Sequence, residues 1–299
     1  MLDQSLLAAV AAVAREGSFE RAARVLNVTP SAVSQRVRLL EERIGAALIV
    51  RGQPCKTTEI GARLCRHAEL VSALEAELRR ELPALPQEPA DALHASLRIA
   101  VNADSLGTWF VEAMADFGRE DATLLSLTLD DEDHTAQWLR RGHVLAAVTS
   151  LRAPVQGCRS RRLGALRYVA TASPAFVRRW FAEGVTAAAL SRAPSLVFDR
   201  YDRLQNIWVR RHLRREVHLP AHRLPSTRAF LDAALAGVGW GMNPWALARP
   251  HLHSGALVEL IPGTPLDVPL QWQVTRLQVP VLERLTRSVA RAAAAALEP

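Results

Sequence analysis

The stretch at positions 18–51 constrains the fold of this chain more than any other part of the sequence. Thr29 is a good N-cap, and Pro30 suits the first helical position, where a missing N–H costs nothing. A helix is predicted to begin here and to end at Gly45, a residue type that commonly follows the last helical turn. Its apolar residues recur at helical spacing and predict one buried stripe: Val33, Val37, Leu40 and Ile44.

A second short helix is predicted directly upstream. Ser18 can cap it over residues 19–26, and only Asn27 and Val28 separate it from Thr29. Two short helices joined by so tight a turn predict a helix-turn-helix, in which the second helix enters a DNA groove. An earlier helix would pack against both through its own apolar stripe: Leu6, Val10 and Val13.

The free face of the predicted recognition helix carries hydroxyl, amide and guanidinium groups, which reach base edges and phosphates in the major groove. The base-reading candidates are Ser31, Ser34, Gln35 and Arg38, and Arg36 flanks the buried stripe. Residues 47–57 contain a β-prone run, a turn and a segment that leads away from the turn, which predicts a small β-wing. Arg51 and Lys56 of this wing are placed to touch phosphate. An ordinary helical hairpin with a solvated face is the alternative at this point.

The composition allows a cytoplasmic nucleic-acid-binding protein without establishing one. The chain has 299 residues, enough for two or three domains, and a formal net charge of +7, which is too small to prove contact with nucleic acid. The three cysteines form no pair with metal-ligand spacing, and their odd number argues against a disulfide framework. No run approaches the roughly 20 apolar residues that cross a bilayer, and residues 6–14 suit a first helix better than a signal peptide.

Enzyme chemistry is not predicted. The sequence contains none of the short motifs that identify nucleophile elbows, zinc proteases, P-loops or dinucleotide-binding turns. His251 and His253 are expected in a loop without carboxylate or cysteine company, so no metal and no cofactor are predicted.

A long helix and a hinge are predicted after the wing. Apolar residues recur at helical spacing over residues 58–82, and this is more apolar stripe than a small head can cover, so pairing with a second copy of the chain is expected. Residues 83–95 contain three prolines within seven positions and predict a semi-rigid hinge. The expected division is a head at 1–57, a dimerisation helix at 58–82, the hinge, and an effector-binding domain at 96–299.

The remainder of the chain alternates strands and helices, which predicts an α/β fold with parallel strands. The expected strands are 97–101, 124–129, 144–149, 167–171, 195–199, 223–225, 239–243, 257–261 and 270–275. The expected helices are 106–117, 135–141, 174–181, 203–214, 227–235 and 280–297. We expect two lobes, lobe 1 at about 96–166 and 268–299 and lobe 2 at about 167–267, with a ligand cleft between them.

These residues resemble the signature of LysR-type transcriptional regulators over nearly the whole chain. The resemblance in the head is carried by Ala32-Val33-Ser34-Gln35, Leu40-Glu41, Ile44-Gly45, Leu48 and Arg51. Similarity to the lysine- and arginine-sensing branch (ArgP/LysG-like) is carried by residues 19–23, 101–106, 108–109, 163–166 and 198–199. The resemblance implies a winged helix-turn-helix joined to a fold like that of periplasmic solute-binding proteins. It also implies a homodimer or homotetramer on operator DNA, control of basic-amino-acid export or metabolism genes, and RNA polymerase as a further candidate partner.

An amino acid effector would need an anion site and a cation site. Ser105 and the pair Ser226 and Thr227 lie at strand–helix junctions, where hydroxyls and backbone N–H groups can take a carboxylate. Asp130 and Asp131 end a strand and could hold an ammonium or guanidinium group. Further expected lining residues are Asn102, Thr149, Ser150 and Asp199. The acidic run 130–133 departs from the mixed stretch typical of that branch, which leaves the ligand open.

Other functions remain as alternatives at this stage. The chain could be a LysR-type regulator of another small-molecule pathway, an intracellular solute-binding protein or a non-specific nucleoid protein. The N-terminal helix-turn-helix argues against the second, and a footprint confined to one promoter would argue against the third.

Overall fold

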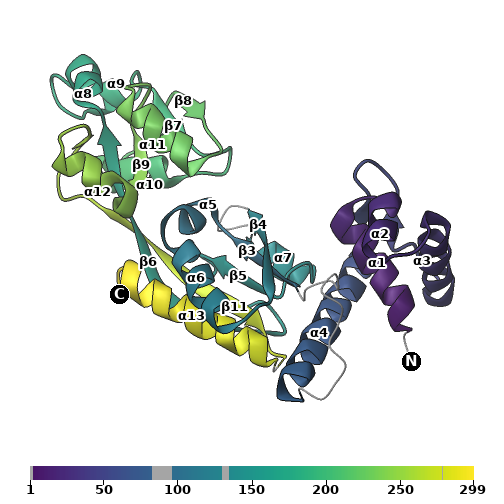
Figure 1. Cartoon of the computed structure of the whole chain (residues 1–299). Helices are drawn as coiled ribbons and strands as arrows, with labels where there is room; N and C mark the ends of the chain where they lie inside the picture. Colours follow the sequence, from purple (N-terminus) through teal and green to yellow (C-terminus); the bar gives the residue numbers. More distant parts are fainter. Residues whose placement is uncertain (1–2, 83–95, 130–134, 278) are drawn as a thin grey trace.

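The computed structural model describes residues 3–82, 96–129, 135–277 and 279–299 and shows a small helical head, a long helix and a two-lobed α/β body (Figure 1). The head contains α1 (Gln4–Glu16), α2 (Phe19–Val25) and α3 (Pro30–Ile44), followed by an antiparallel wing of β1 (Ile49–Val50) and β2 (Lys56–Thr57). The helix α4 (Glu59–Glu81) leads away from the wing. The predicted winged helix-turn-helix is therefore confirmed.

The caps of the head helices are those that the sequence indicates. The Ser18 hydroxyl accepts a hydrogen bond from the Arg21 N–H, and the Thr29 hydroxyl accepts one from the Ala32 N–H. Gly45 ends α3 in the left-handed region with φ 74°. The predicted stripe is buried at Val33, Val37 and Leu40 and packs with the apolar side of α1, while Ile44 is partly buried against the same core.

The wing and α4 are fixed to the recognition helix at short range. Glu41 on α3 accepts the backbone N–H groups of Leu48 and Ile49 at 2.8 and 3.2 Å. Thr58 caps α4 by accepting the N–H of Gly61. A Cβ at position 61 would lie 2.1 Å from the Leu48 carbonyl oxygen, so only glycine permits this close approach of α4 to the wing.

The body is built on one mixed sheet. Within the described residues the strand order is β10-β6-β11-β5-β3-β4, with β9 paired to β6. The strands are β3 (Ser96–Val101), β4 (Leu124–Leu129), β5 (Ala146–Thr149), β6 (Cys158–Ala172), β9 (Gly241–Pro244), β10 (Val258–Glu259) and β11 (Leu266–Thr275). The pairs β3–β4 and β3–β5 are parallel, as predicted, whereas β6 and β11 run antiparallel to their neighbours.

Two long strands, which the sequence did not indicate, join the lobes. The expected strands 167–171 and 270–275 are only parts of β6 and β11, which pair with each other along most of their length. Lobe 1 holds β3–β5, a helical segment of α5 (Ala103–Ser105), η1 (Leu106–Phe110) and α6 (Val111–Glu120), and α7 (Thr135–Arg140) and α13 (Pro280–Ala296). Figure 1 shows β6 and β11 running from this lobe into the other one.

Lobe 2 carries most of the elements between β6 and β11. Its helices are α8 (Pro174–Trp180), α9 (Ala187–Leu190), α10 (Leu204–Leu213), α11 (Thr227–Leu235) and α12 (Trp245–His253), and a parallel pair is formed by β7 (Ser195–Val197) and β8 (Ala221–Arg223). The sequence analysis missed α9 and α12. The prediction that His251 and His253 lie in a loop is therefore wrong, because both belong to the last turn of α12.

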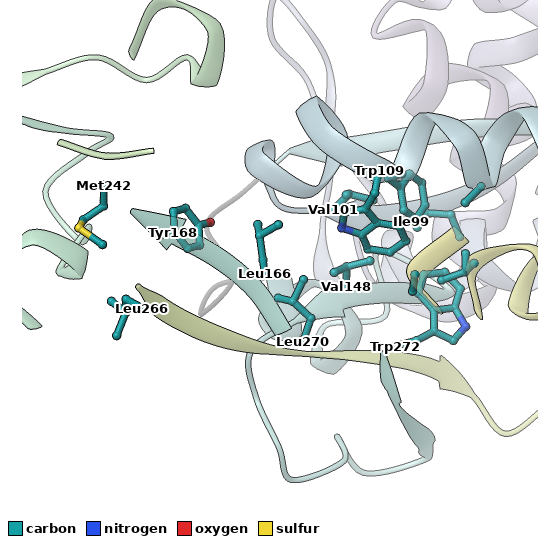
Figure 2. Packing of buried hydrophobic residues seen from close by; sticks show 14 of the residues in the cluster. Ile99, Val101, Trp109, Val148, Leu166, Tyr168, Met242, Leu266, Leu270 and Trp272 are labelled. Carbon is teal, nitrogen blue, oxygen red and sulfur yellow. The ribbon is translucent and has the colours of Figure 1, made fainter. Parts of the chain in front are cut away.

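The main hydrophobic core extends across the junction of the lobes. Figure 2 shows Leu166 and Tyr168 on β6 and Leu270 on β11 between Trp272 in lobe 1 and Met242 in lobe 2. The buried Trp272 donates its indole N–H to the Thr286 hydroxyl of α13 at 3.0 Å, so its one polar atom is satisfied. A shared core means that the two lobes are held by packing as well as by covalent connection.

The helix α4 is attached to lobe 1 by apolar and ionic contacts. Leu70 and Ala73 join the core of lobe 1, and Glu69 pairs with Arg98 of β3 at 2.5 Å. Farther along, Arg284 of α13 lies 2.5 Å from Glu77 of α4 and 2.7 Å from Asp121, at the end of α6. The Asp121 side chain is only 1% exposed. This cluster, Arg284–Glu77–Asp121, fixes the second half of α4 to lobe 1.

Two classes of feature were not found in the part of the chain that the structure describes. No described helix is long and apolar enough to span a membrane. No group of three or more His, Cys, Asp or Glu side chains within the described ranges could hold a metal ion.

Replacing Arg284 by alanine should destabilise the body. The substitution leaves the buried Asp121 carboxylate with Arg80 as its remaining ion-pair partner, at 3.2 Å, and should lower the free energy of unfolding by about 1–3 kcal/mol. Thermal unfolding of the full chain measures this. The exposed pair Arg119–Asp116 provides the control, since Arg119→Ala should change stability by less than about 0.5 kcal/mol. Equal effects of the two substitutions would contradict the role given to the cluster.

Candidate nucleic-acid interface and ligand pocket

The recognition helix presents its polar face to solvent because its apolar stripe is buried in the head. Ser31, Gln35 and Arg38 are exposed, and Ser34 and Arg36 are half-buried. The Ser31 and Thr29 hydroxyls lie 2.9 Å apart at the start of α3. The predicted base-reading groups therefore share one accessible helix face, which suits insertion into a major groove.

The predicted phosphate contacts lie beside this face. Arg51 directly follows β1, Lys56 begins β2, and both are exposed. The Arg51 guanidinium stands 5.3 Å from the centroid of the Phe19 ring, which orients it without neutralising it. Arg38 pairs with Glu42 at 2.9 Å, but both side chains are more than half exposed, so the pair is weak enough for Arg38 to turn toward a nucleic acid.

A pocket of about 360 Å³ lies where the two lobes meet. Lobe 1 contributes Asn102, Ala103, Asp104 and Ser150. Lobe 2 contributes Phe198, Tyr201, Asp202, Arg203, Leu204, Ile207, Thr227, Phe230, Met242 and Pro244, and β11 contributes residues 266–269. The volume suits a small molecule, and the lining combines an apolar wall with a few polar groups, as ligand sites commonly do.

Asp104 connects both lobes inside this pocket. One carboxylate oxygen accepts the Tyr168 hydroxyl of β6 at 2.7 Å, and the other accepts the Thr227 hydroxyl of α11 at 2.6 Å. The contact is tight, since a Cβ on Gly107 would lie 3.3 Å from the Thr227 methyl group. The Asp104 carboxylate is therefore placed at the point where the starts of two helical segments, one from each lobe, approach each other.

Asp202 supplies a second carboxylate from lobe 2. It lies in the turn before α10 and accepts the N–H of Phe198 at 2.8 Å and that of Leu204 at 3.0 Å. Burial raises the pKa of Asp202 above its usual value, and the charge of Asp104 adds to this effect. The third carboxylate of the lining, Asp267, is paired with Arg167 at 2.8 Å. Asp104 and Asp202 are therefore the two carboxylates that suit a cationic ligand.

The structure brings some of the predicted effector residues to this pocket and not others. Asn102, Ser150 and Thr227 line it. Ser105 and Thr149 are fully buried and are not among the lining residues. Asp199 and Ser226 accept backbone N–H groups in a turn and a helix cap. Asp130 and Asp131 lie outside the described residues.

The two pocket carboxylates were missed in the sequence. Asp104 stands beside Ser105, in the first turn after a strand, and Asp202 stands three residues after a predicted lining residue, Asp199. A signal was present, since acidic side chains at the carboxyl ends of strands face the cleft of such folds. The sequence analysis instead assigned the cation site to Asp130 and Asp131, in the acidic run 130–133.

Comparisons with known proteins agree with this architecture. The family model for the bacterial regulatory helix-turn-helix protein of the lysR family matches residues 5–62, and the model for the LysR substrate binding domain matches residues 90–294. The chain is 45% identical to the transcriptional regulator LysG of Mycobacterium tuberculosis over 296 residues, covering 99% of this chain and 95% of that protein. It is 44% identical to ArgP of Pseudomonas fluorescens, covering 100% and 99% of the two chains.

Solved structures give the same result. The crystal structure of ArgP from Mycobacterium tuberculosis matches with a TM-score of 0.80 and 43% identity, covering 100% of this chain and 99% of that one. Full-length LysG from Corynebacterium glutamicum, with arginine bound as effector, matches with a TM-score of 0.70 and 36% identity over 100% of both chains.

Replacing Thr227 by valine should weaken the contact between the lobes. Valine keeps the shape but cannot donate to the Asp104 carboxylate, which should lower the free energy of unfolding by about 1–2 kcal/mol. Thermal unfolding of the ligand-free chain measures this. Thr128→Val on β4 is the matched control, because its hydroxyl makes no hydrogen bond within the described chain. If the two variants unfold at the same temperature, the bond to Asp104 does not stabilise the junction.

Proposed function

The chain belongs to the LysR family of bacterial DNA-binding transcriptional regulators, and from this membership we propose that it responds to arginine or lysine bound between the lobes. The observation that carries the proposal is the pair of carboxylates, Asp104 and Asp202, facing one pocket from opposite lobes. A pocket of this charge selects cations and disfavours acidic amino acids. The relatives are regulators and not enzymes.

Related proteins support this choice of effector. The LysG structure from Corynebacterium glutamicum contains arginine as its effector, and that protein is 36% identical to this chain over its full length. The pocket here also offers apolar side chains, among them Phe198, Ile207 and Phe230, against which methylene groups can pack. The genes controlled would then be those that export or metabolise basic amino acids.

DNA recognition is assigned to the exposed face of α3 and to the wing. Ser31, Ser34, Gln35 and Arg38 read base edges, and Arg36, Arg51 and Lys56 hold phosphates. Because a regulator works where the chromosome lies, we place the protein in the cytoplasm. RNA polymerase is a further partner by analogy with transcriptional control in general.

Assembly through α4 would supply two heads to one operator. Leu74, Leu78 and Leu82 recur every four residues along α4, and each is about half exposed in the single chain. Such a stripe is covered when two copies of the helix pair. We propose the functional division 1–57 for the DNA-binding head, 58–82 for the dimerisation helix, 83–95 for the hinge and 96–299 for the effector-binding domain.

Effector binding must change the relative free energies of two assembly states in order to regulate. Closure of the lobes on a ligand shifts β6 and β11, and α4 follows lobe 1 because Leu70 and Arg284 attach it there. The angle between two paired heads then changes, and with it the spacing or bend imposed on DNA.

Gln35→Ala should remove sequence-specific affinity. Loss of an amide that contacts a base edge should cost about 1–3 kcal/mol on the cognate operator and little on random DNA of the same length. Fluorescence anisotropy at fixed salt measures both. Gln4→Ala, an exposed amide on α1 in the same head, is the control and should bind both DNAs normally. Equal losses on both DNAs would remove Gln35 from base reading.

Isothermal titration of the full chain against a panel of amino acids should identify the effector. Arginine and lysine should bind, whereas glutamate and leucine should not, because two pocket carboxylates call for two cations: leucine carries only its α-ammonium, and glutamate adds an anion. Addition of the bound amino acid should also change operator affinity or the footprint. Binding of leucine or glutamate in preference to the basic amino acids would refute the proposed effector class.

A further inference from the structure

Within the described residues, Asp202 has hydrogen-bond donors but no ion-pair partner. Both carboxylate oxygens accept backbone N–H groups, and the amide of Gln205 adds a longer contact at 3.3 Å. No ion pair to Asp202 occurs among the residues that the structure describes, although Arg203 lines the same pocket. The neighbouring N–H groups fix the orientation of the carboxylate; Oδ2 accepts two donors and Oδ1 accepts one, so Oδ1 keeps a lone pair for a further donor.

An unneutralised carboxylate in a partly desolvated pocket is costly unless a ligand supplies the counter-charge. The raised pKa of Asp202 agrees with this, since burial disfavours its charged form. Among the lining residues close to Asp202 in sequence, Phe198, Leu204 and Ile207 are apolar, and Tyr201 and Arg203 are the polar ones. The lobe 2 side of the pocket therefore offers a charged end with an apolar approach, which matches a cation at the end of a methylene chain.

Asp104 has a different environment. Its oxygens already accept two hydroxyls, from Tyr168 and Thr227. It lies at the start of the continuous helical segment 103–120 and against the first residue of α11. Two helix starts provide backbone N–H groups and positive partial charge for the α-carboxylate of an amino acid. The α-ammonium is bonded to the same carbon and must then lie beside Asp104.

We propose that Asp202 is the specificity-determining residue of the pocket: it binds the side-chain guanidinium or ammonium of the effector, while Asp104 binds the α-ammonium. This inference rests on the proposed function, because it takes a basic amino acid as the ligand. It adds the orientation of the ligand and the residue that distinguishes basic from neutral side chains. A ligand held in this way connects lobe 1 to lobe 2 through its own length.

Calorimetric titration with three ligands tests this orientation. Arginine carries both cations, citrulline replaces the guanidinium by a neutral ureido group, and 5-guanidinopentanoate lacks the α-ammonium. Asp202→Asn should lower the affinity for arginine and for 5-guanidinopentanoate by about 30-fold or more and should change the affinity for citrulline by less than about 3-fold. The preference for arginine over citrulline should therefore be lost. Asp104→Asn should lower the affinity for arginine and citrulline and leave the affinity for 5-guanidinopentanoate nearly unchanged.

Asp232→Asn serves as the matched control, since Asp232 is an exposed aspartate of α11 that pairs only with Arg228 in the described structure. It should bind all three ligands like the unaltered chain. Thermal unfolding of each variant verifies that the lobes are folded.

Asp202→Glu keeps the charge and provides a second test should the asparagine variant fail to fold. The longer side chain moves the carboxylate into the pocket by one methylene, so the affinity ratio of ornithine to lysine should rise by about 5-fold or more. An unchanged ratio would overturn the assignment.

The outcomes separate this inference from the proposed function. If the unaltered chain binds arginine but Asp202→Asn keeps its preference over citrulline, Asp202 is not the specificity residue and the proposed function stands. If Asp104→Asn, and not Asp202→Asn, abolishes that preference, the ligand lies in the opposite orientation. If the unaltered chain binds no basic amino acid, both proposals fail.

Discussion

The pairing of β6 with β11 is the constraint on which the rest of the molecule depends. These strands run through both lobes and belong to one sheet with β5 and β3, so the lobes can move relative to each other only by bending the shared strands. The pocket lies beside this junction, and Tyr168 of β6 donates to Asp104 there. A ligand in the pocket therefore acts on the elements that determine how the lobes are related.

The contact between lobe 1 and α4 connects the lobes to the helix that leads to the head. Glu69 faces Arg98 at the base of this contact, and burial raises the pKa of Glu69 to about 7 even beside the guanidinium. A raised pKa means that the folded state binds a proton more readily than the unfolded chain. This contribution to stability is complete below about pH 4.5 and is lost as the pH rises through 7. The Arg284 cluster makes the opposite contribution: burial raises the pKa of Asp121, but hydrogen bonds from Thr123 and Arg284 outweigh this effect and lower the pKa below its usual value.

The sequence predicted the head closely because its signals are local. Caps at Ser18 and Thr29, a proline at the first helical position and a four-three-four stripe each depend on residues within one or two turns. The crossing strands were not predicted because their length depends on pairing partners about 100 residues away, as between Arg167 and Asp267. Half of β6, residues 158–166, is rich in arginine and mixed in pattern, so periodicity gave no strand signal there.

The sequence predicted the location of the pocket but only some of its lining residues. Asn102 and Thr227 were found because strand–helix junctions are visible in sequence. Which residue of a junction faces the cleft depends on the rotation of the first helical turn, and this turned Asp104 toward the pocket and Ser105 away from it. Asp202 belongs to a turn whose geometry is fixed by its own hydrogen bonds, which no periodic pattern records.

The absence of a side chain at Gly61 has a mechanical consequence. Only a hydrogen atom separates the first turn of α4 from the Leu48 carbonyl, and Glu41 holds the same segment against α3, so α4, the wing and α3 are closely packed at this junction. The long helix and the reading head must then rotate as one stiff body. A rotation imposed at the far end of α4 would then carry α3 with it, and the displacement of the head would grow with the length of the helix.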